Sequence, residues 1–140
     1  MTTSTLLKSW TAEQWDLRYE PGKWSLKEVF IHIMDTERIF AYRALRFARH
    51  DQTPLPGFEQ DDYIPYLEVS NRSGHSIIEE YESTRRATLS MFKNFSADMM
   101  LYNGTASGNS LTPLAIGFII AGHEIHHLDI VKERYLKGEI

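Results

Sequence analysis

Apolar residues recur along most of the chain at steps of three and four positions, which predicts helices rather than strands. The best-marked helix should run from about Leu26 to about Arg49. Ser25 and Glu28 fit a capping box, in which each side chain satisfies a free backbone N–H of the first turn. The positions that follow the helical spacing are Val29, Phe30, Ile33, Glu37, Phe40, Ala41, Ala44 and Ala48.

Three further stretches show helical spacing. Residues 75–95 form one, and residues 113–137 form another, which should end at Gly138. Thr112 followed by Pro113 is typical of a helix start, and the apolar character of the first turns predicts the most buried helix of the protein. Near the N-terminus only residues 6–15 are helical in pattern, so the first helix is expected to be short or trimmed.

Breaks between these stretches set the expected fold. Pro54, Pro56 and Gly57 open a long connection to about Ser70, and residues 103–110 are rich in Gly, Ser and Asn. We therefore predict an all-α protein, a four-helix bundle with up-down order and a long connection between the second and third helices that could hold one crossover. The chain, residues 1–140, is expected to form a single domain.

Composition narrows the possible functions. The 140 residues carry a net charge of −4 and no cysteine, which excludes disulfides, a thiolate nucleophile and a zinc site built on sulfur. No basic run is present, so nucleic-acid binding is not expected. The most apolar stretch, Leu114–Gly122, is much shorter than the roughly 20 residues of a membrane span, and no secretion signal is visible. We expect a cytoplasmic protein without membrane attachment.

The histidines are the most informative residues. His123 and His127 are four positions apart in a predicted helix, so their imidazoles lie about 40° apart around the axis and about 6 Å apart along it. Two such imidazoles can bind one zinc or nickel ion. His32, on the edge of the apolar stripe of the long capped helix, is the best candidate for a third ligand. The alternative is that these are surface histidines at a solvated helix end, with no metal.

A second interpretation of the same string is weaker. Residues 123–127 satisfy His-Glu-x-x-His, a zinc-protease signature in which Glu124 would be the general base. Only thirteen residues follow His127, however, and a third ligand normally lies downstream in such proteases. Glu124 also points about 100° away from His123 around the helix, which favours a solvated flank.

Five segments together resemble the DinB-like (YfiT-type) superfamily of metal-dependent hydrolases. The segments are Pro21–Glu28, His32 with Asp35–Arg38, Arg43–Arg49, Leu55–Phe58, and Gly122–His127 with Glu133–Tyr135. The resemblance implies a four-helix bundle that binds a divalent metal, zinc or nickel, through His32, His123 and His127. His126 does not match a ligand position. Members of the superfamily usually have a longer first helix than this chain shows.

On this basis the expected function is that of a metal-dependent hydrolase, or a thiol-dependent transferase, acting on a small molecule, with a thiol as one candidate. Asp35 is the first candidate for a catalytic base or for a residue that orients a ligand imidazole, and Glu124 is the second. The alternative is a non-catalytic, stress-related bundle in which the metal only stabilises the fold. The resemblance also favours a homodimer. Ile31 and Met34, which lie off the main apolar stripe, are the expected interface; the alternative is that the short first helix or the long connection covers them.

Overall fold

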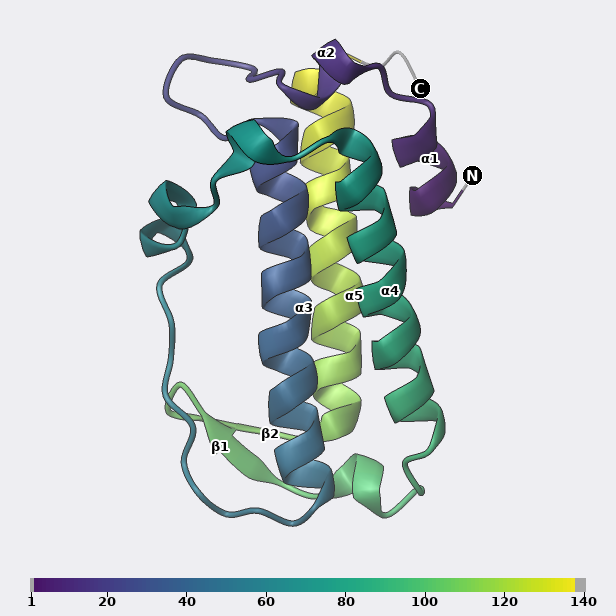
Figure 1. Cartoon of the computed structure of the whole chain (residues 1–140). Helices are drawn as coiled ribbons and strands as arrows, with labels where there is room; N and C mark the ends of the chain where they lie inside the picture. Colours follow the sequence, from purple (N-terminus) through teal and green to yellow (C-terminus); the bar gives the residue numbers. More distant parts are fainter. Residues whose placement is uncertain (1, 138–140) are drawn as a thin grey trace.

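The structure is a computed structural model that describes residues 2–137 (Figure 1). Three long helices form the bundle: α3 (Leu26–Ala48), α4 (Gly74–Lys93) and α5 (Pro113–Ile130), which continues into a π-helical turn, η5 (Val131–Tyr135). Two short helices, α1 (Thr3–Lys8) and α2 (Ala12–Trp15), precede them, and a hairpin of β1 (Gly104–Ala106) and β2 (Asn109–Leu111) precedes α5. Short 3₁₀ turns are η1 (Gln60–Asp62), η2 (Ile64–Tyr66), η3 (Val69–Asn71) and η4 (Met99–Leu101). The mainly helical class is as predicted.

The direction of the helices differs from a simple up-down order. In Figure 1, α3 and α4 run the same way, and α5 runs opposite to both. The reason is the connection of residues 49–73, which returns along the outside of α3 to the end where α3 begins. The short α1 lies beside the first half of α4, so it covers only one end of the bundle.

Capping residues start the helices where the sequence predicts. Ser25 Oγ accepts a hydrogen bond from the Glu28 N–H at 3.3 Å, and Glu28 Oε2 accepts one from the Ser25 N–H at 2.6 Å. Thr112 caps α5 through the Ala115 N–H at 3.1 Å. The predicted capping box and both helix starts are therefore confirmed. The predicted stop at Gly138 lies outside the described residues.

The core consists of two clusters, one at each end of the bundle. One is centred on Trp15, Phe30, Met34, Ile77 and Tyr81, and the other on Phe47, Leu55, Ala106, Ile116 and Ile120. Ile31 and Met34, the expected dimer face, are buried in the first cluster, with 6% and 0% of their surface exposed. The partly buried Leu67 and Val69 of the long connection pack against the same cluster. That interface prediction is wrong, because side chains of the same chain cover this face.

The last helix is more exposed than predicted. Leu114, Phe118 and Ile125 of α5 are 41%, 73% and 59% exposed. The apolar start of α5 predicted burial on all sides, but α3 and α4 cover only part of its circumference. By length and composition alone, Pro113–Tyr135 is also a candidate membrane span, with 22% of the window buried. A core helix passes the same test, so this is weak support for a membrane role.

The hairpin occupies a segment for which the sequence predicts only a loop. Ser107 and Gly108 both have positive φ, 51° and 76°, as the two central residues of a type I′ turn require. Leu55 joins β1 through a bridge to Ala106, with its N–H donating to the Thr105 carbonyl at 2.9 Å. The hairpin thus ties the start of the long connection to the end of α3.

The Ser25 cap gives a testable prediction. Replacing Ser25 by Ala should lower the free energy of unfolding by about 1 kcal/mol, because the first turn of α3 loses a hydrogen-bond acceptor. Urea denaturation of the two proteins measures the difference. Ser90→Ala, on an exposed position inside α4, is the matched control and should cost nothing. Equal effects of the two changes would contradict the role of the cap.

Candidate metal centre

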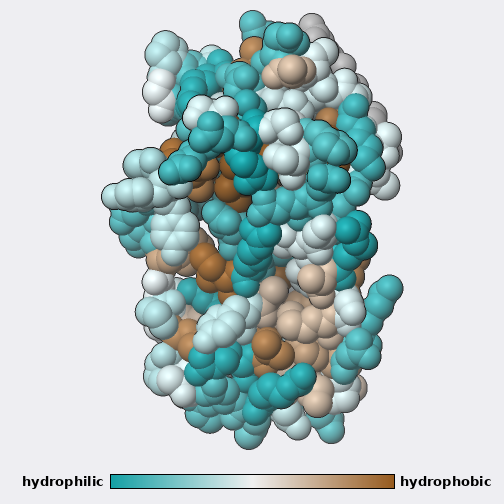
Figure 2. Space-filling view, viewed as in Figure 1, coloured by the Kyte–Doolittle hydropathy of each residue, from teal (hydrophilic) through white to brown (hydrophobic). Residues whose placement is uncertain are grey.

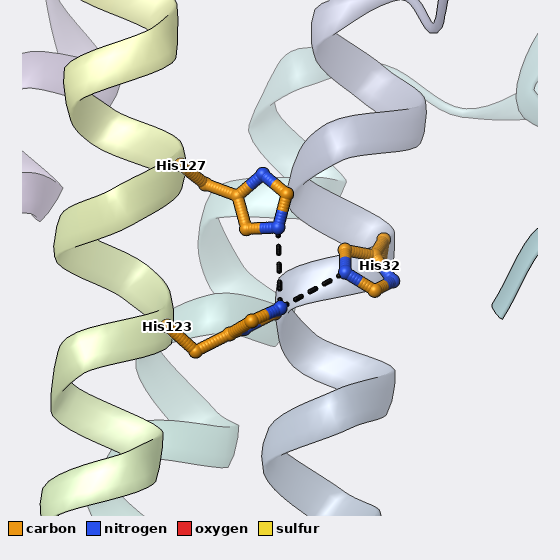
Figure 3. Close-up of side chains that lie close together, drawn as sticks. All are labelled: His32, His123 and His127. Atoms are coloured by element: carbon orange, nitrogen blue, oxygen red, sulfur yellow. Dashed lines mark hydrogen bonds between the residues drawn. The ribbon is translucent and has the colours of Figure 1, made fainter.

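Three imidazoles meet between α3 and α5. His32 comes from α3, and His123 and His127 come from successive turns of α5 (Figure 3). The Nε2 atom of His123 lies 3.0 Å from Nε2 of His32 and 3.1 Å from Nε2 of His127. The three ligand atoms all lie within 4.8 Å of one another. The structure thus brings together the three residues that the sequence predicts as metal ligands.

Helix geometry explains this convergence. His123 and His127 project from one side of α5 because four residues are close to one full turn. The antiparallel α3 packs along that side and supplies His32, which is only 4% exposed. Thr36, one turn further along α3, places Oγ1 3.5 Å from His32 Nδ1. This leaves Nε2 of His32 directed at the two histidines of α5.

The donor set fits a divalent metal ion. Zinc bonds of about 2.1 Å at tetrahedral angles place ligand nitrogens about 3.4 Å apart, close to the two Nε2 separations described above. Burial, and then the charge of His123, lowers the pKa of His32 to about 4. Burial, and then the other histidines, lowers the pKa of His127 to about 3. The imidazoles are therefore neutral at pH 7, as metal binding requires.

His126 lies outside this cluster. Its side chain is exposed, and the centre of its ring is 5.4 Å from that of His127. The group that could hold a metal, among residues 2–137, contains His32, His123 and His127 but not His126.

Asp35, the first candidate base, lies among the charges between α3 and α4. Its Oδ1 is 3.6 Å from Arg38 Nη1, and Arg38 in turn pairs with Glu80 at 2.8 Å. Burial, and to a lesser extent Glu80, raises the pKa of the Asp35 carboxyl, while Arg38 and Arg72 act in the opposite direction. The structure does not place Asp35 in the group of residues around the three imidazole nitrogens.

Glu124, the second candidate, is held in a buried network on another side of α5. It is 6% exposed, accepts a hydrogen bond from the Tyr81 hydroxyl at 2.8 Å and pairs with Arg85. Arg85 also pairs with Glu37 at 2.9 Å, and the Thr3 hydroxyl donates to Glu124. The expected solvated flank is wrong, because Glu124 faces α4 and α1. The sequence analysis missed this network. Its one sign in the sequence was Glu37, a carboxylate at a position of the apolar stripe of α3.

A cavity adjoins the histidines at the end of the bundle where α3 begins. Its volume is about 320 Å³, and it is lined by Tyr19, Lys23, Trp24, His127, Ile130 and Tyr135, among others. The ring of Trp24 lies 5.0 Å from that of His32. Sequence reasoning missed this cavity, because its walls come from a turn before α3 and from the far end of the chain.

A second cavity lies away from the histidines. It has a volume of about 480 Å³ and opens between α3 and α4, where Ala41, Leu45, Ala87 and Met91 are among its lining residues. Figure 2 shows apolar side chains, coloured beige and brown, in the lower half of the view, where α3 and α4 end, and also in a patch above the middle. No histidine lines this cavity, so the smaller cavity beside His127 is the one related to the candidate metal centre.

Comparisons with known proteins agree with this fold. The solved structure of YfiT from Bacillus subtilis, described as a probable metal-dependent hydrolase with an unusual four-helix bundle topology, superposes with a TM-score of 0.69 at 15% sequence identity. The match covers 94% of this chain and 80% of YfiT. No curated protein matches the sequence. The family profile of the DinB superfamily matches residues 1–131, and this chain therefore belongs to the DinB superfamily.

Proposed function

We propose that this protein is a divalent-metal-dependent enzyme, a hydrolase or a thiol-dependent transferase, that acts on a small molecule. The observation that carries the proposal is the convergence of three neutral Nε2 atoms from His32, His123 and His127. Zinc and nickel both suit imidazole donors, and either is a candidate. YfiT, which shares the fold, is itself described as a probable metal-dependent hydrolase.

The number of protein ligands favours catalysis over a purely structural metal. A structural zinc site is closed by four protein ligands, whereas a catalytic site has three and leaves a position for water or substrate. In residues 2–137, the group that could hold a metal has three members. A non-catalytic, metal-stabilised bundle, the competing function, would require a fourth.

The chain's own residues orient the site. A bound zinc or nickel ion supplies Lewis-acid chemistry and acidifies the water or thiol that contacts it. Thr36 lies beside Nδ1 of His32, and the indole of Trp24 covers the same imidazole on another side. Both contacts hold His32 in a fixed orientation, which a ligand contributed by a separate helix needs. Asp35, three positions after His32 on α3, stays the candidate base, and burial raises the pKa of its carboxyl.

Metal binding tests the site directly. The double change His123→Ala and His127→Ala should abolish stoichiometric binding of zinc or nickel, because one imidazole remains. Metal content after dialysis, measured by elemental analysis, gives the result. His126→Ala removes an exposed neighbouring imidazole and should retain a full equivalent of metal. Retention of a full equivalent by the double variant would place the metal elsewhere.

The pH dependence of stability tests the burial of the imidazoles in the metal-free protein. A histidine in the unfolded chain takes up a proton below a pKa of about 6.5, but folded His32 does so only near 4. The unfolded state therefore binds more protons, and the free energy of unfolding should fall by about 2 kcal/mol between pH 7 and pH 5 through His32 alone.

Denaturation of His32→Gln at the two pH values measures that contribution. This variant should lose less stability on acidification than the wild type by about that amount. His75→Gln, which changes a histidine with an 81% exposed side chain, should behave as the wild type does. The same pH dependence in all three proteins would contradict neutral burial of His32.

We also propose a homodimer, with α5 as the interface in place of the covered face of α3. The exposed apolar side chains Leu114, Phe118 and Ile125 follow one side of α5. Gly122 lies between Phe118 and Ile125 on the chain and leaves open space beside the helix. A Cβ atom added at Gly122 would have no other atom within 4 Å apart from its chain neighbours and the backbone of its own helix. Two antiparallel copies of α5 can therefore place each Phe118 against the partner's Gly122, as two-fold symmetry requires.

Light scattering at micromolar concentration should then give about twice the chain mass of 16.3 kDa. Phe118→Glu should reduce the mass to that of a single chain, because it places a charge in an apolar contact. Tyr66→Glu changes an aromatic residue that is 83% exposed on the long connection, and it should leave the dimer intact. A wild-type mass near 16.3 kDa would remove the dimer.

A further inference from the structure

The cavity beside His127 is suited in size and lining to a small ligand. Its volume of about 320 Å³ is within the range of small-molecule sites. Tyr19, Trp24 and Tyr135 give it aromatic walls, and Val29 and Ile130 add aliphatic surface. A ligand with a flat apolar body would fit such walls, and it would contact the edge of the three-histidine cluster through His127.

The walls are held in place by contacts within the chain. The Tyr135 hydroxyl donates to the Trp24 carbonyl at 2.7 Å, and the rings of Tyr135 and Tyr19 meet edge to face at 5.0 Å. These contacts join the segment before α3 to η5, the last helical turn. The cavity is therefore largely formed before any ligand binds, which reduces the entropy lost on binding.

A tight turn places one cation at the rim of this cavity. The Lys23 N–H donates to the Glu20 carbonyl at 3.2 Å, and Gly22 has a φ of 79°. A β-turn with Pro21 and Gly22 as its central residues is typical of type II, in which the second position needs a positive φ. The turn fixes the backbone of Lys23, and the ammonium group stays exposed at the cavity.

A second cation contacts Tyr19, one of the residues that line the cavity. The Arg134 guanidinium sits over the Tyr19 ring, 5.4 Å from its centre, and donates to the Tyr19 hydroxyl at 3.4 Å. Arg18 is different, because its charge is already paired with Glu28 at 2.7 Å. Within residues 2–137, neither Lys23 nor Arg134 has a carboxylate at ion-pair distance. Among the described residues, one cation that lines the aromatic cavity and one that contacts its wall thus lack a carboxylate partner.

We infer that this cavity binds a small carboxylate with an aromatic or apolar body, whose negative charge is recognised by Lys23 and Arg134. This assignment gives the substrate class of the proposed metal enzyme. It rests on the proposed function for the role of the metal. The recognition of the anion itself depends on the two cations and on the aromatic walls. It should therefore be measurable in the metal-free protein, where no metal competes for the carboxylate.

The test compares benzoate with benzamide, which have nearly the same shape and differ in charge. NMR titration of the metal-free protein should show benzoate binding about tenfold more tightly, with shifts at the Trp24 indole and the Gly22 amide. Lys23→Met should weaken benzoate binding about fivefold, and the double change with Arg134→Met should remove the preference over benzamide. Benzamide affinity should stay the same, because its contacts are with the aromatic walls.

Lys93→Met is the matched control, since it removes the same charge from the end of α4, far from the cavity. It should leave benzoate binding unchanged. The inference would be overturned if the wild type bound benzoate and benzamide equally. It would also be overturned if Lys93→Met weakened benzoate binding as much as Lys23→Met does, or if the NMR shifts were confined to another surface.

A parallel zinc titration separates this inference from the proposed function. If zinc fails to bind while the preference for benzoate persists, the metal enzyme is rejected and the anion site stands. If zinc binds through the histidines while benzoate and benzamide bind alike, the carboxylate assignment is rejected and the metal enzyme stands.

Discussion

The buried ion network around Arg85 fixes the rotation of the helices that carry the candidate metal centre. From α4, Arg85 pairs with Glu37 of α3 and Glu124 of α5, and the two carboxylates are 2% and 6% exposed. Tyr81 and Thr3 add hydrogen bonds to Glu124. Removing one member would leave a buried charge without its partner, which is strongly destabilising. The network therefore allows little rotation of α5 about its axis.

This constraint also sets the direction of the histidines. Glu124 follows His123 in the chain, so their side chains point about 100° apart around α5. When Arg85 holds Glu124 toward α4, His123 and His127 face α3, where His32 meets them. The string His-Glu-x-x-His thus has its two histidines at the candidate metal site and its glutamate in the scaffold. The same sequence pattern in a protease would direct its glutamate toward the reaction, so the packing partner, not the motif, decides the role.

The sequence predicted those features that depend on neighbouring residues in the chain. The capping box at Ser25 and the i, i+4 spacing of His123 and His127 are local, and both are present in the structure. Burial was less predictable, because it depends on which helix covers which face. Phe118 lies in an apolar run and is 73% exposed, whereas Met34 lies off its stripe and is fully buried. Glu124 was assigned to solvent for the same reason, since its cationic partner is 39 residues away.

The cavity beside the histidines shows how the non-local contacts matter for function. Its aromatic walls come from the turn before α3 and from η5. These segments lie near opposite ends of the sequence, but a hydrogen bond between Tyr135 and Trp24 joins them in the folded protein. That bond, from Tyr135, holds the backbone of Trp24, whose indole lies 5.0 Å from the ring of His32. One contact thus supports both a wall of the cavity and a residue that packs against the candidate ligand His32. Substitutions at Tyr135 would act on both at once, although Tyr135 is not a member of the histidine cluster.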